Sequence, residues 1–306
     1  MSTSPPARPA ASAPSLPPEG IWRRSLAALY RHVPAQLVLL LAAPVGWFGA
    51  VYLGSLVVLL LSSFWYLNPI TSAVVREFSL SNFQQLIGDP VNRVIVWRTV
   101  SIAGLVTIAD VALAFPIAYF MARVAAPRTR SLLFIAVLLP LWSNYLVRVF
   151  AWRIILAQGG PLDGLLGTVG AQGPGYSDVS TWLVFTYLWL PYMILPIYGG
   201  FERIPGSLFE ASADLGAQGR TTFRRVVWPL VLPAVAAGSI FTFSLTLGDY
   251  ITPALVSKNQ FLGTVIYDNQ GVANNVPFAA TLAIVPMVIM AIYLLVARRL
   301  GAFDAL

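Results

Sequence analysis

Long apolar segments alternate with shorter polar ones along the 306-residue chain, and the apolar segments have the length of membrane spans. A bilayer core of about 30 Å requires roughly 20 apolar residues in a helix. Six segments meet this requirement: residues 37–65, 99–121, 131–150, 181–201, 230–250 and 278–297. The pattern therefore predicts an all-α membrane protein with about six transmembrane helices.

Two regions of this pattern need separate arguments. Asn144 and Arg148 interrupt the second half of segment 131–150, so that span depends on the apolar stretch "LLFIAVLLPLW". Residues 1–20 are rich in Pro, Ser and Ala, which predicts a disordered cytoplasmic tail over about 1–30, ahead of a membrane domain over 31–306. The first apolar run is too long for a signal peptide and has no obvious cleavage site, so we expect a retained helix.

Composition and charge agree with a lipid environment. Hydrophobic residues make up 58% of the chain and charged residues 10%, whereas a soluble domain carries about 25% charged residues. With the N-terminus inside, 13 basic residues fall on inner segments and six on outer ones, which predicts that both termini are cytoplasmic. The net charge of +7 accompanies no nucleic-acid-binding motif, so we expect no nucleic-acid partner.

A polar loop, residues 204–229, separates the fourth predicted span from the fifth on the cytoplasmic side. Ser207 and Glu210 have capping-box spacing, so we expect a short helix over 208–215, closed by Gly216 in the left-handed conformation. A second helical piece over 220–228 leads back into the membrane. Such a helix pair suits either a membrane surface, through arginines and anionic headgroups, or a docking surface for a soluble protein.

The spacing within this loop matches a known signature. Permease subunits of ATP-binding-cassette (ABC) importers carry Glu-Ala-Ala, three residues, Gly, nine residues, Ile, one residue and Leu-Pro. The corresponding residues here are Glu210, Ala211, Ser212, Gly216, Val226, Trp228 and Pro229, with Ser212, Val226 and Trp228 as departures. The chain thus resembles this family over roughly residues 78–300. "FSLSNFQQLI", "PLWSNYLVRVFAWRIIL" and "GDYITPALV" resemble the polyamine type, which imports spermidine and putrescine.

The resemblance implies a type I ABC importer transmembrane domain in the bacterial inner membrane, working by alternating access. The loop would be the coupling helix, which fits a cleft on the ATPase, and Gly216 would make a turn that a side chain would obstruct. The residues implied to contact the ATPase are Glu210, Ala211, Ser212, Asp214, Leu215 and Gly216. The implied partners are two ATPase subunits, a second and different permease subunit, and a periplasmic substrate-binding protein.

Nucleotide chemistry is not expected in this chain. The only lysine, Lys258, has no glycine-rich loop before it, so ATP and Mg²⁺ would be bound by the separate ATPase chains. The chain also lacks G-x-S-x-G and HExxH, which argues against an intramembrane hydrolase or protease. We therefore expect a translocation subunit that is not an enzyme and holds no cofactor.

Polar residues within the spans are candidates for the substrate path. Asp110 lies halfway along the second predicted helix, where a carboxylate is costly unless it is paired, hydrated or protonated. It suits a structural hydrogen bond, a cation site, or the coupling site of an ion-driven secondary transporter, which is the alternative function. Asp249 and Tyr250 near the outer end of the fifth span, with Trp142 and Asn144 in the third, provide a carboxylate and aromatic faces suited to an amine. Tyr and Trp also gather at membrane interfaces without any substrate.

Overall fold

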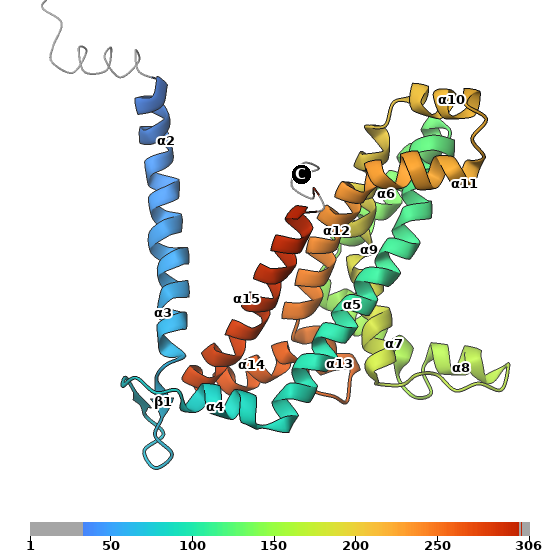
Figure 1. The fold of residues 1–306 in the computed structure, drawn as a ribbon. Helices are drawn as coiled ribbons and strands as arrows, with labels where there is room; N and C mark the ends of the chain where they lie inside the picture. Colours follow the sequence, from blue (N-terminus) through green and yellow to red (C-terminus); the bar gives the residue numbers. More distant parts are fainter. Residues whose placement is uncertain (1–32, 300, 302–306) are drawn as a thin grey trace, which may run out of the picture. The chain divides into compact units, whose positions relative to one another are not determined.

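The computed structural model describes residues 33–299 and residue 301, so the expected tail over 1–30 lies outside the described residues. Contacts divide the chain into two units, one ending at Val58 and the other beginning at Leu59. The described part of the first unit is helical: α2 (Val33–Trp47), the π-helical turn η1 (Phe48–Leu53) and the beginning of α3 (Gly54–Ser62) follow one another (Figure 1). Leu40–Ser62 is apolar and long enough to span a membrane, in agreement with the first predicted span.

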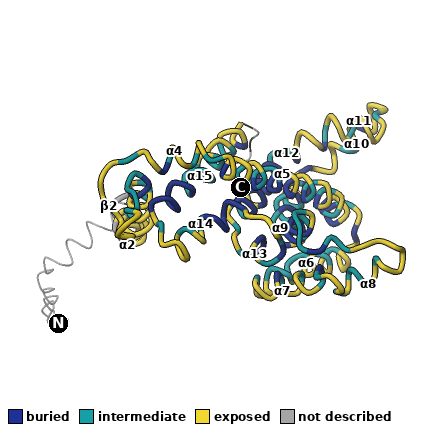
Figure 2. The backbone as a smooth tube through the Cα atoms, turned by 90° about the horizontal axis from the view of Figure 1, so that it is seen from below, coloured by how far each residue is buried: buried dark blue, intermediate teal, exposed yellow. Residues whose placement is uncertain are grey.

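Three long helices form the centre of the second unit. They are α5 (Pro90–Tyr119), α9 (Asp178–Glu202) and α12 (Trp228–Gly248), and they carry most of the buried backbone in Figure 2. Small residues let α9 and α12 approach closely. A Cβ atom added at Gly200 would lie 2.6 Å from the Cβ of Ala234, and one added at Gly238 would lie 2.8 Å from the sulfur of Met193. The two helices are therefore in near backbone contact at two levels.

The remaining elements surround this centre. Near one end lie β1 (Tyr66–Leu67), β2 (Val74–Val75), α4 (Ser81–Gly88), α7 (Tyr145–Leu156), α8 (Pro161–Gly167), α13 (Ile251–Val256) and α14 (Leu262–Gly271) (Figure 1). The two strands pair antiparallel, with Tyr66 opposite Val75. At the other end lie η2 (Phe120–Val124), α10 (Gly206–Asp214), α11 (Gly219–Thr222) and η3 (Phe223–Val227). Alongside the centre run α6 (Pro127–Trp142) and α15 (Val276–Arg299). We call the two ends the α13 end and the α10 end.

Five helices among the described residues are long and apolar enough to cross a membrane, and a sixth span exists only if a bent pair is counted as one. That pair, Pro127–Trp142 and Tyr145–Gly167, bends by 93°. The expected straight helix over 131–150 is therefore wrong. Asn144 is the cause, because its backbone is extended (φ −60°, ψ 131°) and its side chain accepts a hydrogen bond from the Leu146 N–H, which starts a new helix.

The second span begins earlier than the apolar pattern predicted. It starts at Pro90 rather than at 99, because Asp89 accepts a 2.8 Å hydrogen bond from the Val91 N–H and Pro90 occupies the first helical position. The helical segment continues through η2 to Val124. Asp110 still lies near the middle of the span Pro90–Val124, 20 residues after its first residue and 14 before its last.

Candidate functional site

The polar loop folds as two helical pieces, as predicted, but its start differs from the expected one. α10 begins at Gly206, and Pro205 occupies the N-cap position with no side-chain hydrogen bond. Ser207 is therefore already inside the helix, and the predicted capping box with Glu210 is wrong. After α10, the segment α11–η3 continues directly into α12, so Gly219–Gly248 forms one long span.

The carboxyl end of α10 is closed by Gly216 in the left-handed conformation, with φ of +71°. The Gly216 N–H donates to the Ala213 carbonyl at 2.8 Å, and the Ala217 N–H donates to the Ser212 carbonyl at 3.0 Å, as in a Schellman-type end. A Cβ atom at Gly216 would meet nothing within 4 Å in this chain. The backbone angle, and not the space that a side chain would fill, is therefore what requires glycine.

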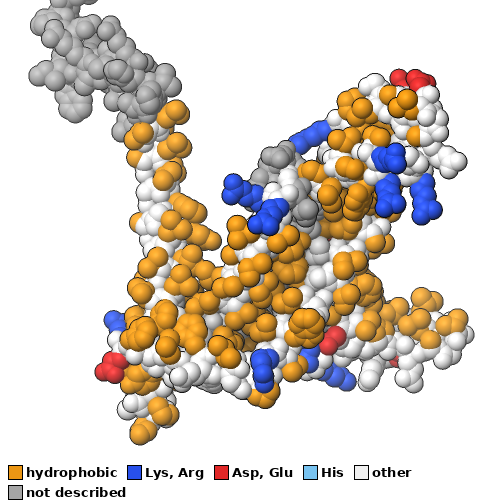
Figure 3. All heavy atoms as spheres, viewed as in Figure 1, with side chains coloured by type: hydrophobic (Ala, Val, Ile, Leu, Met, Phe, Trp, Pro, Cys, Tyr) orange, Lys and Arg blue, Asp and Glu red, His pale blue; other side chains and the backbone are white. Residues whose placement is uncertain are grey.

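The six residues predicted to contact an ATPase do not share one face. Glu210, Ala211, Asp214, Leu215 and Gly216 are exposed, and the Leu215 side chain is 87% exposed. Ser212 instead faces inward, where its hydroxyl lies 2.8 Å from that of Thr222 and joins α10 to α11. Figure 3 shows acidic side chains at the tip formed by α10 and arginines on the adjoining α11–η3 segment. Leu208, Ala211, Leu215, Gln218 and Arg225 are among the residues that line a concavity of about 610 Å³ on this tip.

Asp249 joins three elements at the α13 end. Its Oδ1 accepts hydrogen bonds from the N–H groups of Ile251 at 2.8 Å and Thr252 at 3.0 Å, which starts α13. Its Oδ2 accepts from the Thr252 hydroxyl at 3.1 Å and from the Tyr145 hydroxyl on α7. The carboxylate thus fixes the turn from α12 into α13 and holds it against α7.

The same carboxylate borders an aromatic pocket of about 410 Å³, lined in part by Tyr145, Trp189, Asp249 and Tyr250. The rings of Tyr145 and Trp189 are stacked, with centroids 6.1 Å apart and planes 11° apart. Asp249 lies immediately after the last residue of the span Gly219–Gly248. Burial raises the pKa of its carboxyl group, and hydrogen bonds from Tyr145, Thr252 and Ile251 oppose that rise. No basic side chain forms a salt bridge with Asp249 among the described residues.

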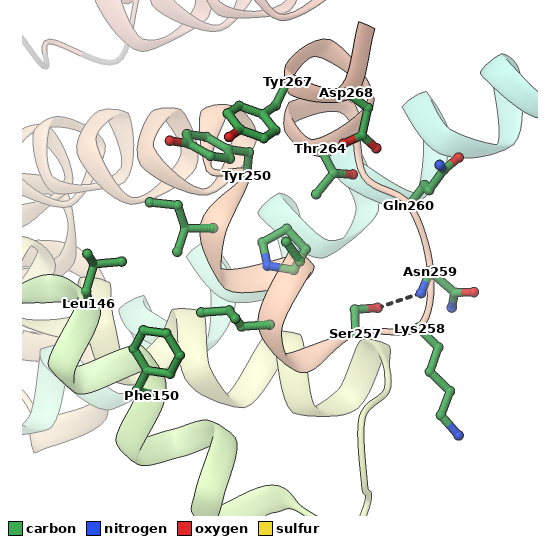
Figure 4. A pocket seen from close by; sticks show the side chains of 14 residues that line it. Leu146, Phe150, Tyr250, Ser257, Lys258, Asn259, Gln260, Thr264, Tyr267 and Asp268 are labelled. Atoms are coloured by element: carbon green, nitrogen blue, oxygen red, sulfur yellow. Dashed lines mark hydrogen bonds between the residues drawn. The ribbon is translucent and has the colours of Figure 1, made fainter. Parts of the chain in front are cut away.

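A second pocket, of about 520 Å³, adjoins the first and shares Tyr250 and Ile251 with it. In Figure 4, the rings of Tyr250 and Tyr267 lie face to face, and their centroids are 4.6 Å apart. Leu146 and Phe150 of α7 form the opposite wall, while the Lys258 side chain extends away from the centre of the pocket. Aromatic faces therefore line a concave surface from α9 across to α14.

Three of the predicted pathway residues lie outside both pockets. Trp142 is 88% exposed at the end of α6, and Asn144 is the cap of α7. The aromatic neighbours of Asp249 are instead Tyr145 and Trp189, which the sequence pattern did not identify. The only signal in the sequence was that Tyr145 follows Asn144 directly.

Asp110 is fully buried, and neither of its carboxyl oxygens has a hydrogen-bond partner among the described residues. A structural hydrogen bond, one of the roles that suit Asp110, is therefore not formed.

Solved structures with a similar fold identify the architecture. The crystal structure of a bacterial ABC transporter that imports the acidic polysaccharide alginate aligns with a TM-score of 0.72 and 15% identity, covering 91% of this chain and 98% of that one. An inward-facing structure of the MetNI methionine ABC transporter aligns with a TM-score of 0.54 and 16% identity, covering 69% and 94%. The fold is therefore that of a type I ABC importer transmembrane domain.

Sequence relatives then identify the family. The inner membrane ABC transporter permease protein YdcU of Escherichia coli (strain K12) is 45% identical over 298 residues, covering 92% of this chain and 95% of that protein. The spermidine/putrescine permease PotB of Haemophilus influenzae is 30% identical over 241 residues, covering 77% and 81%. Residues 114–302 match the family of binding-protein-dependent transport system inner membrane components, and the chain belongs to that family. It is a multi-pass permease subunit of the inner membrane and not an enzyme.

Proposed function

We propose that this permease subunit translocates polyamines, such as spermidine or putrescine, or related small cations. The observation that carries the proposal is the Asp249 carboxylate, which borders the aromatic pocket of Tyr145 and Trp189 without a basic partner in the described part of the chain. Two further facts support it. The PotB relatives are named for spermidine and putrescine, and the match to them covers about three quarters of this chain.

The chemistry of the pocket suits a flexible amine. Each protonated amino group gains from a nearby carboxylate and from the negative faces of aromatic rings, and the methylene segments between amines gain from apolar ring surface. A neutral sugar would give the Asp249 carboxylate no cationic partner, and an acidic oligosaccharide would be repelled by it. The pocket therefore favours cations over both other classes.

We infer the energy source and partners from the other end of the unit. ATP and Mg²⁺ would be bound by two separate ATPase subunits, each docking on a coupling helix, which in this chain is α10. The contact with the ATPase would be formed by the exposed residues Glu210, Ala211, Asp214, Leu215 and Gly216. Ser212 faces inward and joins α10 to α11 through the Thr222 hydroxyl. A second, different permease subunit and a periplasmic binding protein would complete the importer, and both termini of this chain would be cytoplasmic. Closure of the ATPases would draw the coupling helices together and alternate access to the pocket.

Substrate class is tested by ATP-dependent uptake into vesicles that contain the whole transporter. Labelled spermidine and putrescine are expected to be taken up, with no competition from a neutral disaccharide or an acidic oligosaccharide. Asp249→Asn is expected to raise the KM for spermidine about tenfold, which corresponds to about 1.4 kcal/mol. Glu77→Gln, the same charge change at an exposed residue between β2 and α4, is the control. Uptake of a neutral sugar in preference to spermidine would contradict the proposal.

A further inference from the structure

Arg123 lies in the π-helical turn η2 at the α10 end of the second span. Its Nη2 donates hydrogen bonds to the carbonyl of Phe201 at 2.5 Å and to the carbonyl of Ile204. These carbonyls belong to the last turn of α9 and the residues after it, where helical carbonyls have no partner within the helix. One guanidinium group therefore holds the carboxyl end of α9 against the end of the second span.

The same guanidinium also contacts α10. Its carbon atom lies 4.9 Å from the centroid of the Phe209 ring, over the face of that ring. Phe209 is half-buried on the inner side of α10 and packs against the core that includes Met121, Phe201 and Ile204. From its place in η2, Arg123 thus contacts α9 at Phe201, the connecting residue Ile204, and α10 at Phe209.

The other connections of the polar loop to the bundle are of a different kind. Phe115 of α5 packs edge-on against Phe201 and Phe223 and is tilted against Trp228, with ring centroids 5.1, 5.5 and 5.8 Å away. Apolar ring contacts of this kind exclude water but tolerate sliding, whereas hydrogen bonds to two fixed carbonyls do not. Arg123 therefore joins Phe209 of α10 to the carboxyl end of α9 through a guanidinium group that two carbonyls hold in place.

We propose that Arg123 is a positioning residue that couples movement of α10 to the spans α5 and α9. The inference rests on the proposed function, in which an ATPase pushes on α10. Without the guanidinium, α10 would still be present and exposed, but its displacement would be absorbed at the loop 203–205. Lysine cannot replace arginine fully, because its ammonium group lacks the flat face that stacks on the Phe209 ring.

The direct test is the number of substrate molecules imported per ATP hydrolysed, measured in proteoliposomes that contain the whole transporter. Arg123→Gln is expected to lower this ratio at least tenfold, with basal ATP hydrolysis and complex assembly unchanged. Arg123→Lys is expected to give an intermediate ratio. Arg128→Gln is the matched control, because Arg128 is an exposed arginine in the first turn of α6 at the same end. An Arg123→Gln ratio equal to that of Arg128→Gln would overturn the proposal.

Two further measurements test the positioning role of Arg123. If Arg123→Gln fails to assemble, Phe209→Leu keeps apolar volume on α10 but removes the stacked ring, and a normal import ratio in that variant would overturn the proposal. The chain has no cysteine, so spin labels at Leu215→Cys and Ile108→Cys report the position of α10 relative to α5. Both native side chains are highly exposed, at 87% and 68%.

The spin-label distance distribution is expected to broaden in Arg123→Gln but not in Arg128→Gln. This measurement requires no transport. It therefore tests the positioning role of Arg123 even if the transporter shows no ATP-dependent uptake, a result that would contradict the proposed function and not the positioning role. Identical distributions in the two variants would overturn the positioning role.

Discussion

At the residue scale, Gly216 determines how α10 ends. Its φ of +71° is a conformation that an L-amino acid adopts at a cost of roughly 1–2 kcal/mol, and a β-branched residue at more. The signature spacing predicted a left-handed glycine here, and the structure has one. The sequence could not give the reason, because only the coordinates show that the space around Gly216 is open within this chain.

We expect Gly216→Ala to destabilise the end of α10 by about 1 kcal/mol, and Gly216→Val to destabilise it more and to abolish uptake. Capture of substrate by the binding protein should be unchanged, because that step precedes contact with this chain. Hydrogen exchange of the α10 amides measures the first effect. Gly219→Ala is the control, since Gly219 begins α11 without a positive φ and with open space around it. Equal exchange in the Ala variants would contradict this account.

The Asp249 carboxyl group is expected to make the affinity for a cationic substrate depend on pH. Burial raises the pKa of its carboxyl group, so protonation competes with cation binding at a higher pH than for an exposed aspartate, whose pKa is about 3.9. The anion is the form that binds an amine; affinity is therefore retained above the raised pKa and lost as the external pH falls through it. Amine substrates stay protonated throughout this range, so the change belongs to the protein.

The KM for spermidine is thus expected to rise as the external pH is lowered from 7 toward about 3.9, the ordinary aspartate value, and the rise should begin at a higher pH than for an exposed aspartate. In Asp249→Asn the KM should be high and nearly independent of pH, whereas Glu77→Gln should keep the wild-type profile. A wild-type KM that is flat across this range would show that the Asp249 charge does not bind the substrate.

At the element scale, the close approach of α9 and α12 depends on glycine. Gly200→Ala would place a Cβ atom 2.6 Å from that of Ala234, so the helices must separate or bend. Overpacking of this kind costs about 1–3 kcal/mol. We expect a lower unfolding temperature in detergent for Gly200→Ala and an unchanged one for Gly199→Ala, whose added Cβ would meet nothing within 4 Å. Ala234→Gly in the same chain should restore stability; failure to do so would show that the loss has another cause.

The apolar pattern of the sequence predicts the membrane spans but not the bends and short helices between them. Apolar runs located all the spans, because lipid-facing and buried positions are both apolar in a membrane helix. They did not locate the 93° bend between α6 and α7, since both halves are apolar and only the Asn144 cap marks the break. The apolar pattern also does not predict the short helix α13, because "GDYITPALV" carries no long period and its shape depends on the contact between Asp249 and Tyr145.

At the scale of the second unit, the two ends have different chemistry. The α10 end carries charged side chains on an exposed tip (Figure 3), and the α13 end carries a pocket lined in part by Tyr145, Trp189 and the Asp249 carboxylate. Signature spacing identified the loop at the α10 end, because a motif is local in sequence. The pocket at the α13 end joins Tyr145, Trp189 and Asp249 from three different elements, so no local pattern could have assembled it. In the sequence, Arg123 is one of the 13 basic residues on inner segments, and its contacts with Phe201, Ile204 and Phe209 cannot be predicted from its neighbours in the chain.

We propose that import by this subunit is driven by ATP hydrolysis on other chains. Spermidine uptake into proteoliposomes tests this proposal when the vesicles contain either the co-purified transporter or this chain alone. Uptake is expected only with the whole transporter, with ATP inside and binding protein outside, and a protonophore is expected to have no effect. Uptake by this chain alone that follows a proton gradient and is lost in Asp110→Asn would contradict it and would identify an ion-coupled transporter instead.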